Sequence, residues 1–141
     1  MDREVLAKEI IETFEAVNAE RILDKIKFTV KGENILLLLL EDYGGRSTPS
    51  KLIERLDYSA ARLSAVIKSL EGKGYVEILR NDKDKRSKII ALTADGESFC
   101  RQMRREMTTN ALSIIEELGE EDTSELLRIF RRFAGLYSIE N

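Results

Sequence analysis

The hydrophobic periodicity of the chain changes abruptly at Gly74, and this change limits the folds open to it more than any other feature. Before it, apolar residues within 63–70 follow the i, i+3, i+4, i+7 spacing of one helix face. After it, residues 75–79 and 88–92 are two short β-prone runs joined by a polar stretch, 81–87. The pattern predicts a helix followed by a β-hairpin with a loop longer than a two-residue turn.

Helical spacing dominates the rest of the chain. Leu6, Ile10, Phe14 and Val17 form one apolar stripe, which predicts a helix over residues 1–27. Further helices are expected over residues 33–42, 49–56, 59–72, 93–118 and 124–137, with an interruption at 119–123. The expected N-caps are Thr48 before Pro49, Ser59 or Asp57, and Thr93, because their side chains can accept from free backbone N–H groups.

The composition argues against an enzyme. None of the 141 residues is histidine, which excludes zinc sites with His ligands and every His-based general acid or base. There is no phosphate-cradling glycine loop and no nucleophile paired with a base, so we expect no cofactor and no catalysis. The single cysteine, Cys100, is expected to be a buried, inert thiol. A lone cysteine and the absence of a signal peptide or a long apolar run favour the cytoplasm over a membrane.

Positive charge gathers in the middle of a chain whose formal net charge is −3. Residues 46–88 carry eleven Lys or Arg and six Asp or Glu, a balance of +5. Residues 1–45 and 89–141 each carry six basic and ten acidic residues, a balance of −4. A basic centre between acidic ends is typical of a DNA-reading module flanked by other helices, although a chance clustering of solvated charges would give the same sums.

The predicted helix over residues 59–72, called the reading helix below, separates its faces as a helix in the DNA major groove would. Its outward positions are small, hydroxyl-bearing or basic: Ala61, Arg62, Ser64, Ala65 and Lys68. Small residues let the backbone approach base edges, while hydroxyl and basic groups can contact phosphates or bases. Taken alone, the helix could also be an ordinary amphipathic one, but the basic hairpin that follows favours a wing that reaches the minor groove.

Three segments in this order resemble the MarR family of bacterial and archaeal regulators. They are Leu-Glu-Gly-Lys-Gly-Tyr-Val-Glu at 70–77, Asn-Asp-Lys-Asp-Lys-Arg at 81–86 and Leu-Thr-Ala-Asp-Gly at 92–96. The spacing matches without gaps over 70–96. Two departures are Ile78 and Ala65, at positions where the family often has a basic residue.

The resemblance implies a homodimer held by the first and last helices, with Arg86 in the minor groove and Asp84 helping to hold it. It also implies repression by occlusion of a pseudo-palindromic operator. Release by a small anionic phenolic ligand, bound in the crevice between the two parts of the molecule, is expected by the same resemblance. The alternative is a winged-helix protein-interaction module without specific DNA binding, which the acidic overall charge, Ile78 and Ala65 favour slightly.

The expected fold is mainly α with a small β-hairpin wing, a winged helix-turn-helix core flanked by N- and C-terminal dimerisation helices. The expected parts are an N-terminal dimerisation helix (1–30), a DNA-binding region (31–97) with its wing at 75–92, and C-terminal dimerisation helices (98–141). The expected partners are double-stranded DNA, a second copy of the chain and a small-molecule effector, with no membrane. The candidate DNA-contacting residues are Ser59, Ala61, Arg62, Ser64, Ala65, Lys68, Arg80, Lys83, Asp84, Lys85 and Arg86.

Overall fold

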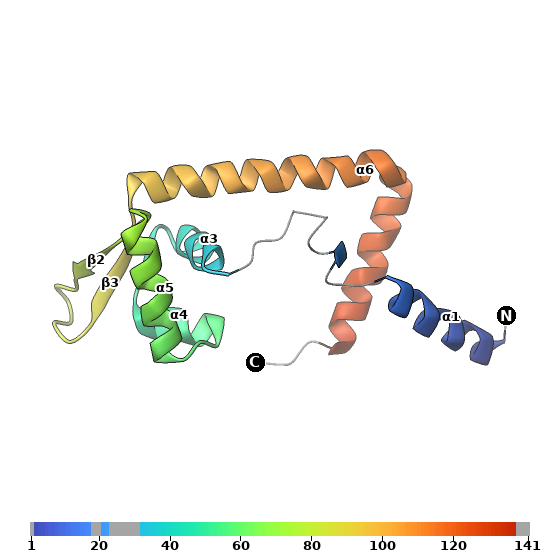
Figure 1. The fold of residues 1–141 in the computed structure, drawn as a ribbon, viewed down its shortest axis with the longest axis horizontal. Coiled ribbons are helices and arrows are strands. Elements are labelled where there is room, and N and C mark those ends of the chain that lie inside the picture. The colour runs from blue at the N-terminus through green and yellow to red at the C-terminus, as the bar shows by residue number, and fades with distance from the viewer. Residues whose placement is uncertain (1, 18–20, 23–31, 138–141) are drawn as a thin grey trace. The chain divides into compact units, whose positions relative to one another are not determined.

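The computed structural model describes residues 2–17, 21–22 and 32–137. Along the chain the principal elements are α1 (Arg3–Ala16), α3 (Asn34–Asp42), β1 (Arg46–Ser47), α4 (Pro49–Leu56), α5 (Ala60–Gly72), β2 (Val76–Arg80), β3 (Lys88–Leu92) and α6 (Ala94–Tyr137) (Figure 1). Their contacts divide the chain into two compact units, one of residues 30–105 and one of residues 1–29 together with 106–141. The predicted class, mainly helical with a small hairpin wing, is confirmed.

In the unit of residues 30–105, the two short helices begin at the predicted caps. The Thr48 hydroxyl accepts from the Lys51 N–H at 3.5 Å, with Pro49 at the first helical position of α4. The Ser59 hydroxyl accepts from the Arg62 N–H at 3.1 Å at the start of α5. Asp57, the alternative cap, instead lies in the connection after α4 with φ 54°. The sequence therefore fixes where the reading helix begins.

The wing is part of a three-stranded antiparallel sheet in the order β1-β3-β2. Val76 pairs with Leu92 and Arg80 with Lys88 across the hairpin. The strand β1 was not predicted, because two residues are too few to show a period, and it exists by pairing with β3. The first wing strand begins at Val76 rather than Tyr75, whose ring instead stacks on Phe99 with 4.5 Å between the ring centroids.

The core of this unit forms where one face of each of α3, α4 and α5 meets the sheet and the first turns of α6. Its buried members are Leu36, Leu37, Leu40, Leu52, Leu63, Ile67, Leu70, Val76, Ile90, Leu92, Cys100 and Met103. Full burial of one such aliphatic side chain stabilises the fold by about 1.5–3 kcal/mol. Three core residues lie on one face of α5, so this face is fixed in the unit and the opposite face is exposed.

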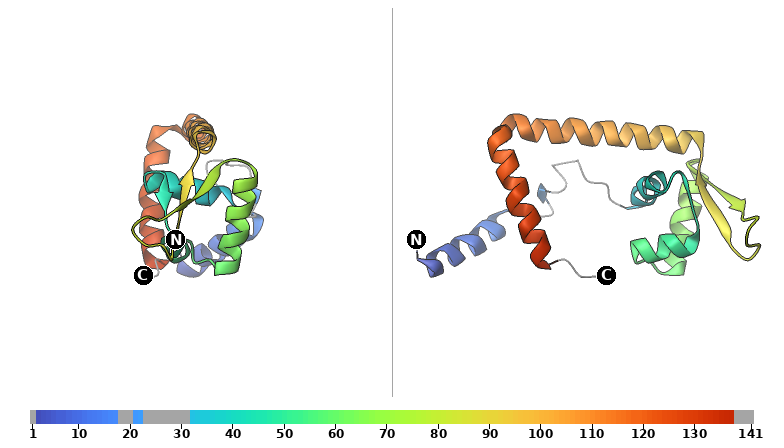
Figure 2. Two further views of the ribbon diagram at one scale, coloured as in Figure 1. Left: turned by 90° about the vertical axis from the view of Figure 1, so that its left-hand side faces the viewer. Right: turned by 180° about the vertical axis from the view of Figure 1, so that it is seen from behind.

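The helix α6 begins at the predicted cap, where the Thr93 hydroxyl accepts from the Gly96 N–H at 3.0 Å. It bends at Gly119, whose φ of 82° and ψ of 163° lie outside helical geometry (Figures 1 and 2). The interruption predicted over residues 119–123 is therefore wrong in extent, since residues 120–123 are helical. A glycine supplies this conformation without steric penalty, so one residue is enough to turn the helix.

The first helix is shorter than predicted. It begins at the cap Asp2 and ends at Ala16, and Val17 leaves helical geometry with ψ 88°. The expected helix over 1–27 is wrong at its end, because the apolar spacing continues through Val17 while the helical backbone geometry ends at Ala16. Residues 18–20 and 23–31 lie outside the described part of the chain. The apolar stripe of α1 is exposed, as are the last turns of α6. None of the described helices is long and apolar enough to cross a membrane.

Candidate nucleic-acid interface

The helix α5 exposes a continuous face next to its buried one. The predicted contact residues Ala61, Arg62, Ser64, Ala65 and Lys68 are all exposed, whereas Leu63, Ile67 and Leu70 are buried. At helical spacing, Ala61 and Ala65 lie along the middle of the exposed face, with Arg62 on one side and Ser64 and Lys68 on the other. The arrangement presents small side chains at the centre and polar groups at both edges.

The start and the end of α5 are held in place by polar contacts. The Arg62 guanidinium lies 4.0 Å from the centroid of the Tyr58 ring at the start of the helix. Just beyond its end, the Lys73 ammonium donates to the Glu33 carboxylate, which precedes α3. The contact with Lys73, followed by a hydrogen bond with Ser69, lowers the pKa of Glu33. These contacts join α5 to α3 and to the connection that precedes it.

The loop at the wing tip is ordered by its own polar side chains. The Asn81 side chain accepts from the Lys83 N–H at 3.1 Å and donates to the Ser87 hydroxyl at 2.8 Å. The Asp84 carboxylate accepts from the Arg86 N–H at 3.0 Å. Side-chain contacts of this kind replace regular pairing in turns, and they hold the loop in one shape as it extends beyond the strands (Figure 2).

Asp84, which the family resemblance implies helps to hold Arg86, contacts the backbone of that residue in the structure. The carboxylate binds the backbone N–H of Arg86, and no ion pair joins the two side chains in the described part of the chain. Arg80, Lys83, Lys85 and Arg86 are exposed, and none of them forms an ion pair with another described residue. Their positive charge is therefore directed to solvent and available to an anionic partner.

Further basic residues flank this surface and were not predicted. Lys51 and Arg55 are exposed on α4, Arg46 is exposed on β1 and Lys88 on β3. In a helix-turn-helix the first helix crosses the phosphate backbone. The signal was present in the sequence, since these residues belong to the basic stretch 46–88, and the structure shows that their side chains are exposed.

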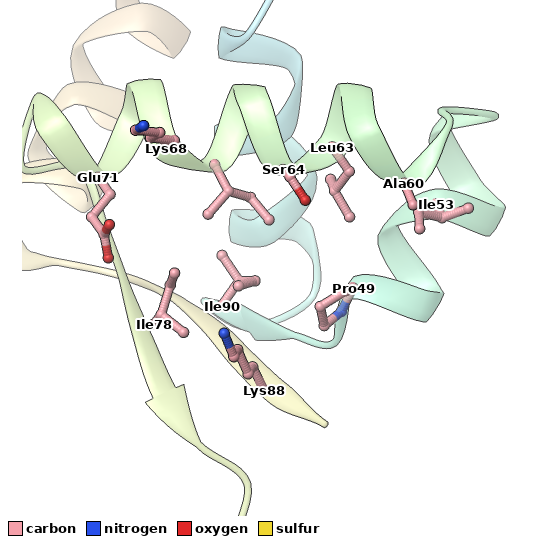
Figure 3. A pocket seen from close by; sticks show the side chains of 11 residues that line it. Pro49, Ile53, Ala60, Leu63, Ser64, Lys68, Glu71, Ile78, Lys88 and Ile90 are labelled. Carbon is pink, nitrogen blue, oxygen red and sulfur yellow. The ribbon is translucent and has the colours of Figure 1, made fainter. Parts of the chain in front are cut away.

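A pocket of about 220 Å³ lies between α5 and the wing (Figure 3). Its walls are mostly apolar, with Ile53, Ile67, Ile78 and Ile90 among them. Polar groups also line it, and they are Ser64, Lys68 and Glu71 from α5 and Lys88 from β3 (Figure 3). Ser64 and Lys68 therefore belong both to the exposed face of α5 and to this pocket.

The order of helices, the three-stranded sheet and the basic loop at the hairpin tip define a winged helix-turn-helix protein. A family model described as "MarR family" matches residues 34–87. Over these residues the chain is similar to the MarR family of regulators.

Known proteins resemble the chain over more of its length. The "Organic hydroperoxide resistance transcriptional regulator" of Bacillus subtilis is 29% identical over 100 residues, covering 71% of this chain and 66% of the relative, slightly less than two thirds. The crystal structure of the YusO protein from Bacillus subtilis has a TM-score of 0.77 at 18% identity, over 96% of this chain and 99% of that one. A mutant of MarR from E. coli complexed with operator DNA has a TM-score of 0.61 at 20% identity, over 94% of this chain and 99% of that one. At these identities the two structures show a shared fold.

Proposed function

We propose that this chain is a sequence-specific DNA-binding regulator that inserts α5 into the major groove and the wing tip into the adjacent minor groove. The observation that carries the proposal is the basic surface of α5 and the 81–87 loop, whose exposed cations have no acidic partner among the described residues. The major groove, about 12 Å wide, accepts a helix whose central positions are as small as Ala61 and Ala65. A neighbour of the same fold is complexed with operator DNA, which supports this use of the fold.

We further propose a homodimer that represses by occupying a pseudo-palindromic operator. Residues 1–30 and 98–141 would form the dimerisation part, because α1 and the end of α6 expose large apolar side chains. Residues 31–97 would form the DNA-binding region. In such a dimer the two copies of α5 read half-sites about 34–36 Å apart. A protein that acts on the chromosome in this way works in the cytoplasm of a bacterial or archaeal cell.

The test is selection of bound fragments from a random DNA pool by the purified full chain at near-physiological salt. We expect one enriched palindrome, bound with an affinity that falls steeply as salt rises, because phosphate contacts release counterions. Arg86→Ala is expected to weaken binding by about 1–3 kcal/mol, the range for loss of an arginine that contacts base edges. A folded dimer that enriches no sequence would contradict the proposal.

The pocket between α5 and the wing supports a small aromatic, anionic effector. Its apolar walls suit an aromatic body. The ammonium groups of Lys68 and Lys88 outnumber the single carboxylate of Glu71, and this balance suits an anionic group. A ligand there would occupy Ser64 and Lys68, which DNA would also contact, so binding of the two would be mutually exclusive. Salicylate is expected to release the selected palindrome. Measured against each variant's own affinity for DNA, the release should be weaker in Lys88→Ala and unchanged in Lys51→Ala. If none of the simple aromatic carboxylates releases the palindrome, the proposed effector site is contradicted.

A protein-interaction module without specific DNA binding is the second candidate, and Ile78 is the observation that favours it. This residue is apolar, is 39% exposed on the wing and occupies a place where a basic residue would add a DNA contact. A partner protein that binds the wild type but not Ile78→Lys, together with no enriched DNA sequence, would favour this candidate.

A further inference from the structure

Tyr58 contacts the one basic side chain in the first turn of α5. Its ring lies under the Arg62 guanidinium, 4.0 Å from the ring centroid, while its body packs against the core cluster that includes Leu63. The tyrosine is half-buried and Arg62 is exposed. Tyr58 is thus anchored in the unit and can limit the positions that the Arg62 guanidinium takes.

The position of Arg62 on α5 indicates which part of DNA it meets. Arg62 is two residues away from Ser64, which faces the wing, so the two side chains point to opposite edges of the exposed face. Ala61 and Ala65 occupy the middle. When a helix about 10–12 Å across fills a groove about 12 Å wide, its central positions face the bases and its edges face the groove walls. Those walls are the two phosphate backbones.

Stacking on an aromatic ring suits an arginine that binds phosphate. The ring covers one flat face of the guanidinium, and the five N–H donors lie in the plane and stay free for a two-pronged contact. The Arg62 backbone N–H is already bound by the Ser59 cap, so its backbone is also fixed. A side chain held in place before binding loses less conformational freedom when it binds.

We propose that Tyr58 is a positioning residue that holds Arg62 against the groove wall away from the wing, where Arg62 binds a backbone phosphate. This inference rests on the DNA-binding function proposed above and adds a specific role for one pair of residues. Because a phosphate carries no sequence information, the pair sets affinity and orientation rather than base preference.

The experiment measures binding of the full chain to the selected palindrome and to a scrambled duplex of equal length, over a series of salt concentrations. Arg62→Ala should weaken both by the same factor and lower the salt slope by about one for each half-site. Tyr58→Leu keeps apolar packing and removes the ring, and should weaken binding about two- to five-fold per half-site. It should have no further effect when Arg62 is already alanine. Tyr58→Phe, which keeps the ring, should bind like the wild type.

Other results of this binding experiment would overturn either the inference or the proposed function. A loss confined to one base position in Arg62→Ala, or an equal effect of Tyr58→Leu with and without Arg62, would overturn the inference while leaving the proposed function intact. Failure of the wild type to bind either duplex would overturn the proposed function itself. If Tyr58→Leu does not fold, Arg62→Lys replaces it: the charge stays and the planar stack is lost, so affinity should fall while the salt slope is kept. Unchanged affinity would overturn the inference.

Discussion

At the scale of single residues, Gly96 shows how one absent carbon decides the packing of a helix. A Cβ built there would lie 2.1 Å from the backbone oxygen of Tyr75, which also accepts from the Thr93 N–H. We expect Gly96→Ala to lower the free energy of unfolding by about 1–3 kcal/mol, since overpacking against a fixed backbone outweighs the better helix propensity of alanine.

The matched control is Gly72→Ala at the end of α5, where a Cβ would meet nothing within 4 Å. Thermal or chemical denaturation of the two variants measures the difference. Equal stability of both would show that the start of α6 can shift away from Tyr75.

Cys100 is a residue-scale case in which burial sets the chemistry. The side chain is fully buried, and its sulfur donates to the Leu37 carbonyl at 3.5 Å. Burial raises the pKa of the thiol to about 11. Reaction with iodoacetamide at pH 8 should therefore be about a hundred-fold slower in the native protein than in denaturant, as the thiolate fraction requires. Comparable rates would mean that α6 opens readily.

The same pKa predicts a pH dependence with a definite sign. Between the unfolded pKa near 9 and the folded pKa of about 11, the unfolded chain loses the thiol proton and the folded chain keeps it. The unfolded state therefore binds fewer protons in this window, and the free energy of unfolding falls as pH rises through it. Cys100→Ala should remove this part of the alkaline decline.

At the scale of elements, the reading helix and the wing were predictable because each has a strong local signal. The period changes at Gly74, and the caps Thr48, Ser59 and Thr93 mark three helix starts, all of which the structure confirms. These are short-range properties of the chain, so sequence spacing is sufficient to find them.

Other features depend on contacts that no local pattern contains. The strand β1 has two residues and exists only by pairing with β3, and the bend in α6 uses Gly119 alone. The end of α1 lies inside an unbroken apolar stripe. The stacking of Arg62 on Tyr58 depends on side-chain orientation, and the pocket between α5 and the wing requires the sheet to be placed first. The roles of the candidate DNA-contacting residues remain predictions.

The wing offers an element-scale test of what Asp84 does. Because its carboxylate accepts from the Arg86 backbone N–H, we expect its acceptor oxygen to matter and its charge to disfavour DNA. Asp84→Asn keeps an oxygen at the same place and should bind the selected palindrome as tightly as the wild type or more tightly. Asp84→Ala should loosen the loop and weaken binding several-fold, a loss of about 1 kcal/mol.

Fluorescence anisotropy on a labelled duplex separates these outcomes. A weakened Asp84→Asn variant would indicate instead that the carboxylate holds the Arg86 guanidinium by its charge. Thermal denaturation of both variants controls for an effect on the fold.

At the scale of the whole molecule, α1 and the last turns of α6 expose several large apolar side chains. In α1 and in the last turns of α6, Phe14 is 65% exposed, Phe130 62% and Leu136 73%. Contiguous exposed apolar residues mark interaction sites, and a self-complementary patch gives a symmetric dimer. The homodimer stays a prediction, and it determines whether two reading helices can bind one palindrome together.

A single exposed phenylalanine tests this directly. In a monomer, Phe130→Glu would place a charge in water with little effect on stability; in the proposed dimer it would bury an unpaired charge and cause dissociation. We expect sedimentation equilibrium to give twice 16.1 kDa for the wild type and for Phe130→Leu, and 16.1 kDa for Phe130→Glu at micromolar concentration. Because binding to the two half-sites is then no longer linked, the affinity of Phe130→Glu for the palindrome should fall toward that for a half-site. A Phe130→Glu variant that stays dimeric and keeps full affinity would place the subunit interface elsewhere.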